Sequence, residues 1–302
     1  MKLPERVRIR DVGPRDGFQN VRTFIDTDKK LEIIDGLVAA GIQAIEITSF
    51  VNPKAIPQMA DAAKVAAEVR KKYPDLEALA LVPNMRGAEN ASKSGIRNVA
   101  YVVSASEAHN KANVNRTIDE SVENLRELVL QHPKLNIRVD IATAFGCPYS
   151  GITSPENVFR LLKVCGELGI HEVTLCDTIG IANPKQVSGL LNAVKDGFPE
   201  MNIALHLHNT RGMALANMAV AAECGITDFE TSVGGLGGCP FAPGSEGNAA
   251  TEDTVYMFEQ MGVETGIDLE KLIETVAYVQ ANVDAPVTGK MLKVKNSTCI
   301  NS

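Results

Sequence analysis

Apolar segments of four to eight residues alternate with amphipathic helical stretches eight times along this 302-residue chain. The alternation predicts an α/β fold, and the number and length of the units favour a closed (β/α)8 TIM barrel with a C-terminal helical extension. A doubly wound open sheet is the alternative, but no glycine fingerprint follows the first predicted strand. We expect one catalytic domain over 1–302, with the barrel at about 7–262 and a C-terminal helix and tail at 263–302. Within this extension, 268–283 predicts a helix and 290–302 predicts irregular chain.

The predicted strands are separated by helical patterns with recognisable ends. The strands begin near Val7, Ala44, Glu77, Asn98, Asn136, Glu172, Asn202 and Asp228. Apolar residues recur at helical spacing most clearly in 31–38, 118–129 and 158–168. Gly41 and Gly169 are typical helix ends, and Ser154 with Pro155 is a typical helix start.

The composition limits the classes of function. The hydrophobic fraction is 45% and the formal net charge is −7, which argues against nucleic acid as a partner because such proteins carry a basic surface. No apolar run approaches the length that crosses a bilayer, so we expect no membrane partner. Six scattered cysteines without a Cys-x-x-Cys pair, and an N-terminus without an apolar signal segment, predict a cytoplasmic protein in a reducing compartment.

The strand that begins near Asn202 ends in the pattern His206-Leu207-His208. Residues two apart on a strand point to the same face, so both imidazoles can reach one metal ion. Two core histidines satisfied by neighbours are the simpler interpretation of such a pair. An Asn-Thr-Arg-Gly turn follows at the carboxyl end of a barrel strand, where (β/α)8 enzymes carry their chemistry, and this favours metal ligation.

A turn flanked by glycines follows the first predicted strand and holds Arg15 beside Asp16. A surface ion pair is the simpler interpretation, and such pairs contribute little to stability. At the end of a barrel strand, however, Asp16 would be an oxygen ligand that completes a set with His206 and His208. Two nitrogens and one oxygen without thiolate suit Mg²⁺ or Mn²⁺, which we expect as the cofactor; Zn²⁺, Co²⁺ and Fe²⁺ also fit these ligand types.

The segment 232–248 contains six glycines and two prolines, which argues against regular structure and indicates a mobile loop. Cys239 lies in the middle of this loop. It is poorly placed for packing and well placed to act as an acid or base over a closing site, although a surface loop without function has the same composition. Asn248 ends the loop and offers its amide oxygen as a fourth metal ligand.

Two further carboxylates, Glu46 and Asp177, end apolar strands and need partners if they are buried. We expect Arg15 or a metal-bound histidine to be the partner. A role in orienting these groups and a role in direct proton transfer are both open for the two carboxylates.

Together these motifs resemble the 3-hydroxy-3-methylglutaryl-CoA lyase family, within the metal-dependent TIM-barrel lyase and Claisen-condensing superfamily. The resemblance extends from about Val7 to Asn282. The Arg-Asp and His-x-His motifs are common to the superfamily, whereas the glycine loop is the narrower marker of the lyases. The matching motifs are Gly-Pro-Arg15-Asp16-Gly-x-Gln-Asn, Glu46-x-Thr-Ser-Phe-Val, Asp177-Thr-Ile-Gly, His206-x-His208-Asn-Thr-x-Gly and Gly-Leu-Gly-Gly-Cys239-Pro.

The resemblance implies cleavage of 3-hydroxy-3-methylglutaryl-CoA into acetyl-CoA and acetoacetate, a reaction of leucine degradation and ketone-body formation. It also implies that Arg15 binds the substrate and stabilises the oxygen that gains charge. The metal ligands implied by the resemblance are Asp16, His206, His208 and Asn248.

The resemblance further implies that Cys239 takes part in protonating the enolate of acetyl-CoA. Asp177 and Glu46 would orient other groups or relay protons. The first base remains open between His206, Asp177 and a water molecule.

Other functions fit parts of this pattern. A condensing acyltransferase or aldolase of the same superfamily would act on acetyl-CoA and a 2-oxo acid, and a related lyase would act on another 3-hydroxyacyl-CoA. A barrel that binds metal without catalysis is a third possibility, which the intact set of polar residues disfavours. For the lyase we expect a small-molecule acyl-CoA substrate and a homo-oligomer, either a dimer or a larger assembly.

Overall fold

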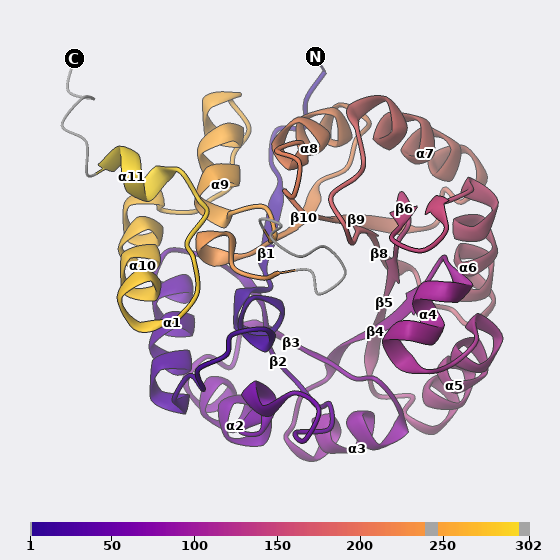
Figure 1. The fold of residues 1–302 in the computed structure, drawn as a ribbon, viewed down its shortest axis with the longest axis horizontal. Coiled ribbons are helices and arrows are strands. Elements are labelled where there is room, and N and C mark those ends of the chain that lie inside the picture. The colour runs from indigo at the N-terminus through magenta and orange to yellow at the C-terminus, as the bar shows by residue number, and fades with distance from the viewer. Residues whose placement is uncertain (1, 239–246, 296–302) are drawn as a thin grey trace.

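The computed structural model is a closed barrel of eight parallel strands surrounded by helices, seen down the barrel in Figure 1. The structure describes residues 2–238 and 247–295. Neighbouring strands pair in the order β1-β10-β9-β8-β5-β4-β3-β2, and β2 pairs again with β1 to close the barrel. The TIM-barrel prediction is therefore confirmed, and the open-sheet alternative is wrong.

The barrel strands begin where the apolar segments predict them. Seven strands start at the predicted residue, and β1 starts at Arg8, one residue after Val7. The strands are β1 (Arg8–Asp11), β2 (Ala44–Ser49), β3 (Glu77–Leu81), β4 (Asn98–Ser104), β5 (Asn136–Ala142), β8 (Glu172–Asp177), β9 (Asn202–Leu207) and β10 (Asp228–Thr231). The short strands β6 (Gly146–Cys147) and β7 (Gly151–Ile152) form an antiparallel hairpin in the loop after β5.

Helices follow the barrel strands and form the outer ring (Figure 1). They are α1 (Thr27–Ala39), α2 (Ala62–Lys72), α3 (Met85–Lys93), α4 (Glu107–Val114), α5 (Ile118–Gln131), α6 (Pro155–Glu167), α7 (Pro184–Gly197), α8 (Ala214–Glu223) and α9 (Thr251–Gln260). Thr117 and Glu120 form a reciprocal capping box that starts α5. The apolar stripe of α5 is buried, including Val122, Leu125 and Leu128, so periodicity in the sequence correctly indicated the face that packs on the barrel.

The C-terminal helix α10 (Leu269–Asn282) agrees with the helix predicted at 268–283 and packs against α1 (Figure 1). Close packing of the two helices depends on Gly36, because a Cβ at this position would lie 2.5 Å from Thr275 Oγ1. The expectation of irregular chain from residue 290 is wrong for α11 (Met291–Lys295). The backbone N–H groups of Lys290 and Met291 donate to the carboxylate of Asp253 on α9, at 2.8 and 3.0 Å, and this contact fixes the start of α11.

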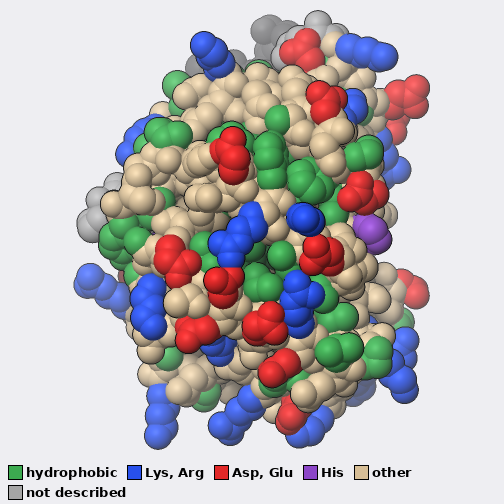
Figure 2. All heavy atoms as spheres, turned by 90° about the vertical axis from the view of Figure 1, so that its right-hand side faces the viewer, with side chains coloured by type: hydrophobic (Ala, Val, Ile, Leu, Met, Phe, Trp, Pro, Cys, Tyr) green, Lys and Arg blue, Asp and Glu red, His purple; other side chains and the backbone are tan. Residues whose placement is uncertain are grey.

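Acidic and basic side chains are interspersed on the side of the barrel covered by α5, α6 and α7 (Figure 2). Two ion pairs join α5 to α6: Arg126 lies 3.3 Å from Glu167, and Arg160 pairs with Asp119. Exposed pairs of this kind contribute at most about 1 kcal/mol each. Among the described residues, no helix is long and apolar enough to cross a membrane.

Candidate metal centre and active site

Asp16, His206 and His208 come together at the carboxyl ends of the barrel strands. One potential ligand atom from each residue lies within 4.8 Å of the other two. Asp16 is in η1 (Gly13–Gly17), the helical turn directly after β1, and His206 and His208 lie at the end of β9. All three side chains are buried. The predicted convergence is therefore confirmed, whereas ligation of an ion stays a prediction.

The chemistry of these three residues fits a divalent cation. His208 Nδ1 is buried and has no hydrogen-bond partner in the described part of the chain, which leaves an unused lone pair or N–H in the site. Burial and the neighbouring His206 lower the pKa of His208 to about 4, so this imidazole is neutral at pH 7. Burial raises the pKa of Asp16, but the charges of Arg15 and His206 and the hydrogen bond from Asn248 help to outweigh burial, and the pKa falls to about 2. An ionised carboxylate and a neutral imidazole are the protonation states that metal ligation needs.

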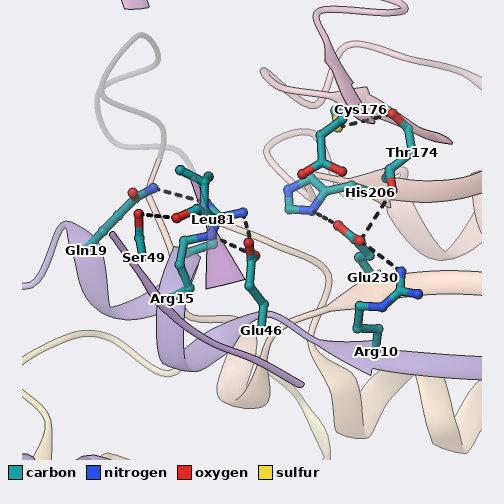
Figure 3. A network of polar contacts seen from close by, with 12 residues as sticks. Arg10, Arg15, Gln19, Glu46, Ser49, Leu81, Thr174, Cys176, His206 and Glu230 are labelled. Carbon is teal, nitrogen blue, oxygen red and sulfur yellow. Dashed lines mark hydrogen bonds and ion pairs between the residues drawn. The ribbon is translucent and has the colours of Figure 1, made fainter. Parts of the chain in front are cut away.

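Arg15 is held in place by two carboxylates. Its Nε donates to Glu46 Oε2 at 2.7 Å, as Figure 3 shows, and its Nη1 donates to Asp16 Oδ1. Burial lowers the pKa of Arg15, but Glu46 and Asp16 raise it by more, so the guanidinium stays charged. Burial in turn raises the pKa of Glu46, although Arg15 and Arg138 oppose this effect. The prediction that Arg15 is the partner of Glu46 is confirmed.

Asp177 is anchored by backbone groups instead. Its carboxylate accepts the N–H groups of Ile181 at 3.0 Å and Ala182 at 2.9 Å, in the loop between β8 and α7. Within the described residues neither Arg15 nor an imidazole donates a hydrogen bond to this carboxylate, so the expected hydrogen-bond partner is wrong for Asp177; His206 acts on the carboxylate through its charge, which lowers the pKa. Burial raises its pKa to about 6 despite the two backbone hydrogen bonds. A catalytic role for Asp177 stays a prediction.

Asn248 lies beside Asp16. Its Nδ2 donates to Asp16 Oδ2 at 2.8 Å and to the carbonyl oxygen of Leu236 at 2.9 Å. Both partners are acceptors, so the amide nitrogen faces them and the amide oxygen is left for a donor or an ion. The role of Asn248 as a fourth ligand stays a prediction.

The glycine segment 232–248 is only partly described, and Cys239 lies outside the described residues. The segment starts with η3 (Val233–Gly235), a buried three-residue turn in which Gly234 departs from helical geometry. The expectation that the segment lacks regular structure is wrong only for this short turn. Gly234 has a φ of 67°, a conformation that glycine adopts without strain, and its N–H donates to Glu252 Oε2 at 3.0 Å. The first glycines thus shape a fixed turn.

Sequence reasoning missed a set of charged strand residues behind His206. Glu230 Oε2 lies 3.1 Å from His206 Nδ1, and Glu230 Oε1 lies 3.1 Å from Arg10 Nη1 (Figure 3). Glu230 Oε1 also lies 2.9 Å from Arg138 Nη2. In the strand register, Glu230 stands directly beside both His206 and Arg10. Arg138 is on β5, which does not pair with β10, so these side chains meet inside the barrel. The available signal was the charge at alternate positions of apolar strands, such as Asp228-Phe229-Glu230.

This network determines the charge of its members. Burial raises the pKa of Glu230, but Arg138, His206 and Arg10 lower it by more, so Glu230 is ionised. Burial lowers the pKa of His206, but the hydrogen bond to Glu230 and the charge of Asp16 more than offset this, and the net shift is upward. The two histidines therefore differ, because only His206 has a carboxylate behind it.

An eight-stranded parallel barrel that gathers an aspartate, two histidines and a buried arginine at the carboxyl ends of its strands defines a class of protein, the TIM-barrel enzymes with a candidate metal centre. Comparison with known proteins places the chain within this class. The profile of the HMGL-like family matches residues 6–279. The chain belongs to the hydroxymethylglutaryl-CoA lyase family.

Relatives in this family cover nearly the whole chain. A hydroxymethylglutaryl-CoA lyase of Bacillus subtilis is 46% identical over 99% of this chain and 100% of the relative, and its crystal structure superposes with a TM-score of 0.94 over 98% of this chain and 100% of that one. The mitochondrial hydroxymethylglutaryl-CoA lyase of Homo sapiens is 40% identical over 98% of this chain and 91% of the relative. An HMG-CoA lyase from Acinetobacter baumannii, solved in complex with coenzyme A and 3-methylmalate, is 39% identical with a TM-score of 0.92 over 99% of this chain and 98% of that one. These relatives are lyases, so the condensing alternative is not favoured.

Proposed function

We propose that this chain cleaves 3-hydroxy-3-methylglutaryl-CoA into acetyl-CoA and acetoacetate in a reaction that depends on a divalent metal ion. The observation that carries the proposal is the convergence of Asp16, His206 and His208 beside Arg15, in a chain 46% identical to a hydroxymethylglutaryl-CoA lyase along its whole length. The complex of the Acinetobacter relative with coenzyme A and 3-methylmalate supports a substrate that joins a CoA thioester to a hydroxy acid.

Asp16, His206 and His208, with Asn248 as a fourth ligand, would hold the ion, for which the mixed oxygen and nitrogen ligands favour Mg²⁺ or Mn²⁺. When bound, the ion would chelate the tertiary hydroxyl and the carboxylate of the substrate and lower the pKa of that hydroxyl. The side chain of Asn248 steadies Asp16 through its Nδ2 and can turn its remaining oxygen to the same centre.

Arg15 would bind the substrate oxygen that gains negative charge as the bond between carbons 2 and 3 breaks. Glu46 and Asp16 hold the guanidinium from two sides before substrate arrives, so little reorganisation is needed during the reaction. Glu46 has no other hydrogen-bond partner among the described side chains that surround Arg15, and we assign it the role of orienting Arg15. A permanently charged group suits this role because it donates no proton to the product.

Cys239 would deliver the proton that converts the enolate of acetyl-CoA into product. The support is its position three residues after Leu236, whose carbonyl oxygen accepts a hydrogen bond from Asn248 at the site. Asp177 is the carboxylate whose pKa, raised by burial to about 6, suits a proton-transfer role near neutral pH. Cys239→Ala should lower kcat while leaving metal affinity unchanged, and a normal rate would remove the thiol from the mechanism.

The assay that tests this function measures acetoacetate released from 3-hydroxy-3-methylglutaryl-CoA with Mg²⁺ or Mn²⁺, with and without EDTA. We expect release that EDTA abolishes and added metal restores. A small panel of other 3-hydroxyacyl-CoA thioesters tests the range of substrates. Product formed only from acetyl-CoA and a 2-oxo acid would show a condensing enzyme and refute the proposal.

We also propose that residues 1–302 act as one catalytic domain in a cytoplasmic homo-oligomer. Packing of α10 against α1 supports the single domain, because it joins the C-terminal extension to the first barrel helix. Sedimentation equilibrium of the full chain measures the mass of the assembly directly, and a monomer would contradict this part of the proposal.

A further inference from the structure

Glu230 is a buried carboxylate that is not among the proposed metal ligands but contacts one of them, His206. Glu230 is 2% exposed, and its Oε2 lies 3.1 Å from His206 Nδ1. The two residues are register partners on β10 and β9, so backbone pairing as well as the side chains fixes their separation. His208 has no such partner at its Nδ1 within the described residues.

The other oxygen of Glu230 faces two arginines and a hydroxyl. Arg10 Nη1 lies 3.1 Å from Oε1 and Thr174 Oγ1 lies 3.4 Å away (Figure 3). Arg138 Nη2 forms an ion pair with the same oxygen at 2.9 Å. Both guanidinium groups are buried, at 2% and 4% exposure, so water screens their charges little. Two permanent cations against one oxygen keep Glu230 ionised, and an ionised carboxylate can only accept hydrogen bonds.

A hydrogen bond between an acceptor-only carboxylate and His206 Nδ1 requires the proton on Nδ1. In the neutral imidazole this leaves Nε2 without a proton, as the ring nitrogen available to a cation. Because the same carboxylate is clamped by residues of three other strands, β1, β5 and β8, the ring plane of His206 is fixed as well.

We propose that Glu230 is a positioning residue for the metal centre: it selects the Nδ1–H tautomer of His206 and thereby presents Nε2 as a ligand before the ion binds. The inference rests on the proposed metal site and deepens it. It also bears on the first base of the reaction. A ring with Nδ1–H engaged by Glu230 and Nε2 given to the ion has no free nitrogen with which to accept the hydroxyl proton, which leaves Asp177 or a water molecule for that step.

Glu230→Gln tests the proposal because it preserves the size of the side chain but replaces one acceptor oxygen by a donor NH₂ group. The amide oxygen of the glutamine must face the donors of Arg10, Arg138 and Thr174, so its NH₂ faces His206 Nδ1. His206 is then forced into the Nε2–H tautomer, which places a proton where the ion should bind. We expect the Kd for Mn²⁺ to rise about 10- to 100-fold, the range measured when partners behind a metal ligand are removed.

Asp140→Asn is the matched control. Asp140 is 4% exposed and its Oδ1 lies 2.9 Å from Arg138 Nε, so this variant makes the same carboxylate-to-amide change against the same arginine without touching His206. Titration of the metal-free proteins with Mn²⁺ in a calorimeter compares both variants with wild type, without any thioester present. We expect less than about a threefold change in Kd for the control. Equal losses in both variants would reduce Glu230 to a member of a structural ion network and overturn the proposal.

The tautomer can be measured in the wild-type chain, which needs no variant to fold. The sequence contains five histidines, so ¹⁵N-histidine labelling gives a simple spectrum in which loss of one signal pair in His206→Asn assigns His206. At a pH high enough for the imidazole to be neutral, we expect a protonated Nδ1 and an unprotonated Nε2 in metal-free wild type, and the reverse in Glu230→Gln. A neutral wild-type His206 whose single proton is on Nε2 would refute the proposal whether or not the chain proves to be a lyase.

Discussion

The barrel contains two kinds of buried carboxylate, which differ in their partners. Asp16 and Glu230, which we name the cation-paired carboxylates, each contact an arginine: Asp16 pairs with Arg15, and Glu230 lies 2.9 Å from Arg138. Asp11 and Glu252, which we name the unpaired acids, contact no Lys or Arg side chain among the described residues. Asp11 accepts Gly13 N–H at 2.8 Å and Thr251 Oγ1–H at 2.6 Å, and Glu252 accepts Gly234 N–H at 3.0 Å.

The difference in partners becomes a difference in charge. Burial alone dominates the unpaired acids and raises the pKa of Asp11 to about 7 and that of Glu252 to about 8. Burial acts on the cation-paired carboxylates too, but the nearby cations outweigh it, and the pKa of Asp16 falls to about 2. Glu46 shares Arg15 with Asp16, and for this residue burial prevails and the pKa rises. Among these five described carboxylates, the two that keep their charge, Asp16 and Glu230, are those influenced by both an arginine and a histidine, at the candidate metal centre.

Of the changes considered, removal of Arg15, the cation that pairs with Asp16, should have the largest effect on activity. Arg15→Gln leaves Glu46 and Asp16 without their permanent positive partner and leaves the developing substrate charge unopposed. We expect kcat to fall by about 10²- to 10³-fold, measured as acetoacetate released at saturating substrate. Arg15→Lys keeps the charge but not the planar fork that joins the two carboxylates, so it should recover only part of the loss. A kcat near wild type in Arg15→Gln would show that this cation is structural only.

Asp16→Asn and Asp11→Asn make the same chemical change five residues apart, once in each group. Asp16→Asn removes an ionised oxygen ligand, so Mn²⁺ affinity should fall by at least about tenfold. Asp11→Asn removes a carboxyl that is neutral for half the molecules near pH 7 and makes no contact with the histidines, so its Mn²⁺ affinity should equal that of wild type. Calorimetric titration of the metal-free variants measures both values, and equal losses would remove the distinction between the groups.

The fold and the three converging residues were predictable because they depend on local pattern and one general rule. Apolar runs and helical periodicity are set by neighbouring residues, which is why seven strands begin at the predicted position. The carboxyl ends of parallel barrel strands share one face, so Asp16 and His206 had to be close once the barrel was assumed.

The partners of the buried charges were not predictable by the same reasoning. Glu230 meets Arg138 across the barrel interior, and this contact depends on strand tilt and register, which no local pattern specifies. Both Glu46 and Asp177 were expected at strand ends, but Glu46 lies within β2, whereas Asp177 is the last residue of β8 and its carboxylate accepts the amides of Ile181 and Ala182. Sequence singled out Glu46 and Asp177 as carboxylates that would need partners, whereas only the structure shows Glu230, Asp11 and Glu252 to be buried and separates the carboxylates with a cation from those without one.

The unpaired acids make a prediction about stability against pH. Glu252 has an ordinary pKa of 4.5 and a folded pKa of about 8, so between these values the folded chain holds a proton that the unfolded chain has released. This contribution to stability is complete below pH 4.5 and is lost as pH rises through about 8, at up to about 1.4 kcal/mol per pH unit. Glu252→Gln should therefore flatten the decline in the free energy of unfolding between pH 6 and 8, measured by urea denaturation. Glu68→Gln on the exposed face of α2 should leave the slope as in wild type; an equal slope in all three proteins would show that Glu252 is not protonated when folded.

The smallest effect is expected for the stability of Asp11→Asn at pH 4. At this pH the folded wild type carries Asp11 as the neutral acid, since its pKa is raised by burial to about 7, and the ordinary pKa of 3.8 leaves much of the unfolded chain protonated as well. An asparagine keeps the shape and the neutral charge, and its oxygen can still accept Gly13 N–H while its NH₂ donates to the hydroxyl of Thr251. The free energy of unfolding should change by less than about 1 kcal/mol, because no charge is lost and each hydrogen bond has a replacement. A loss several times larger would mean that Asp11 is ionised in the folded chain, and Asp11 would then belong with the cation-paired carboxylates in spite of having no cation beside it.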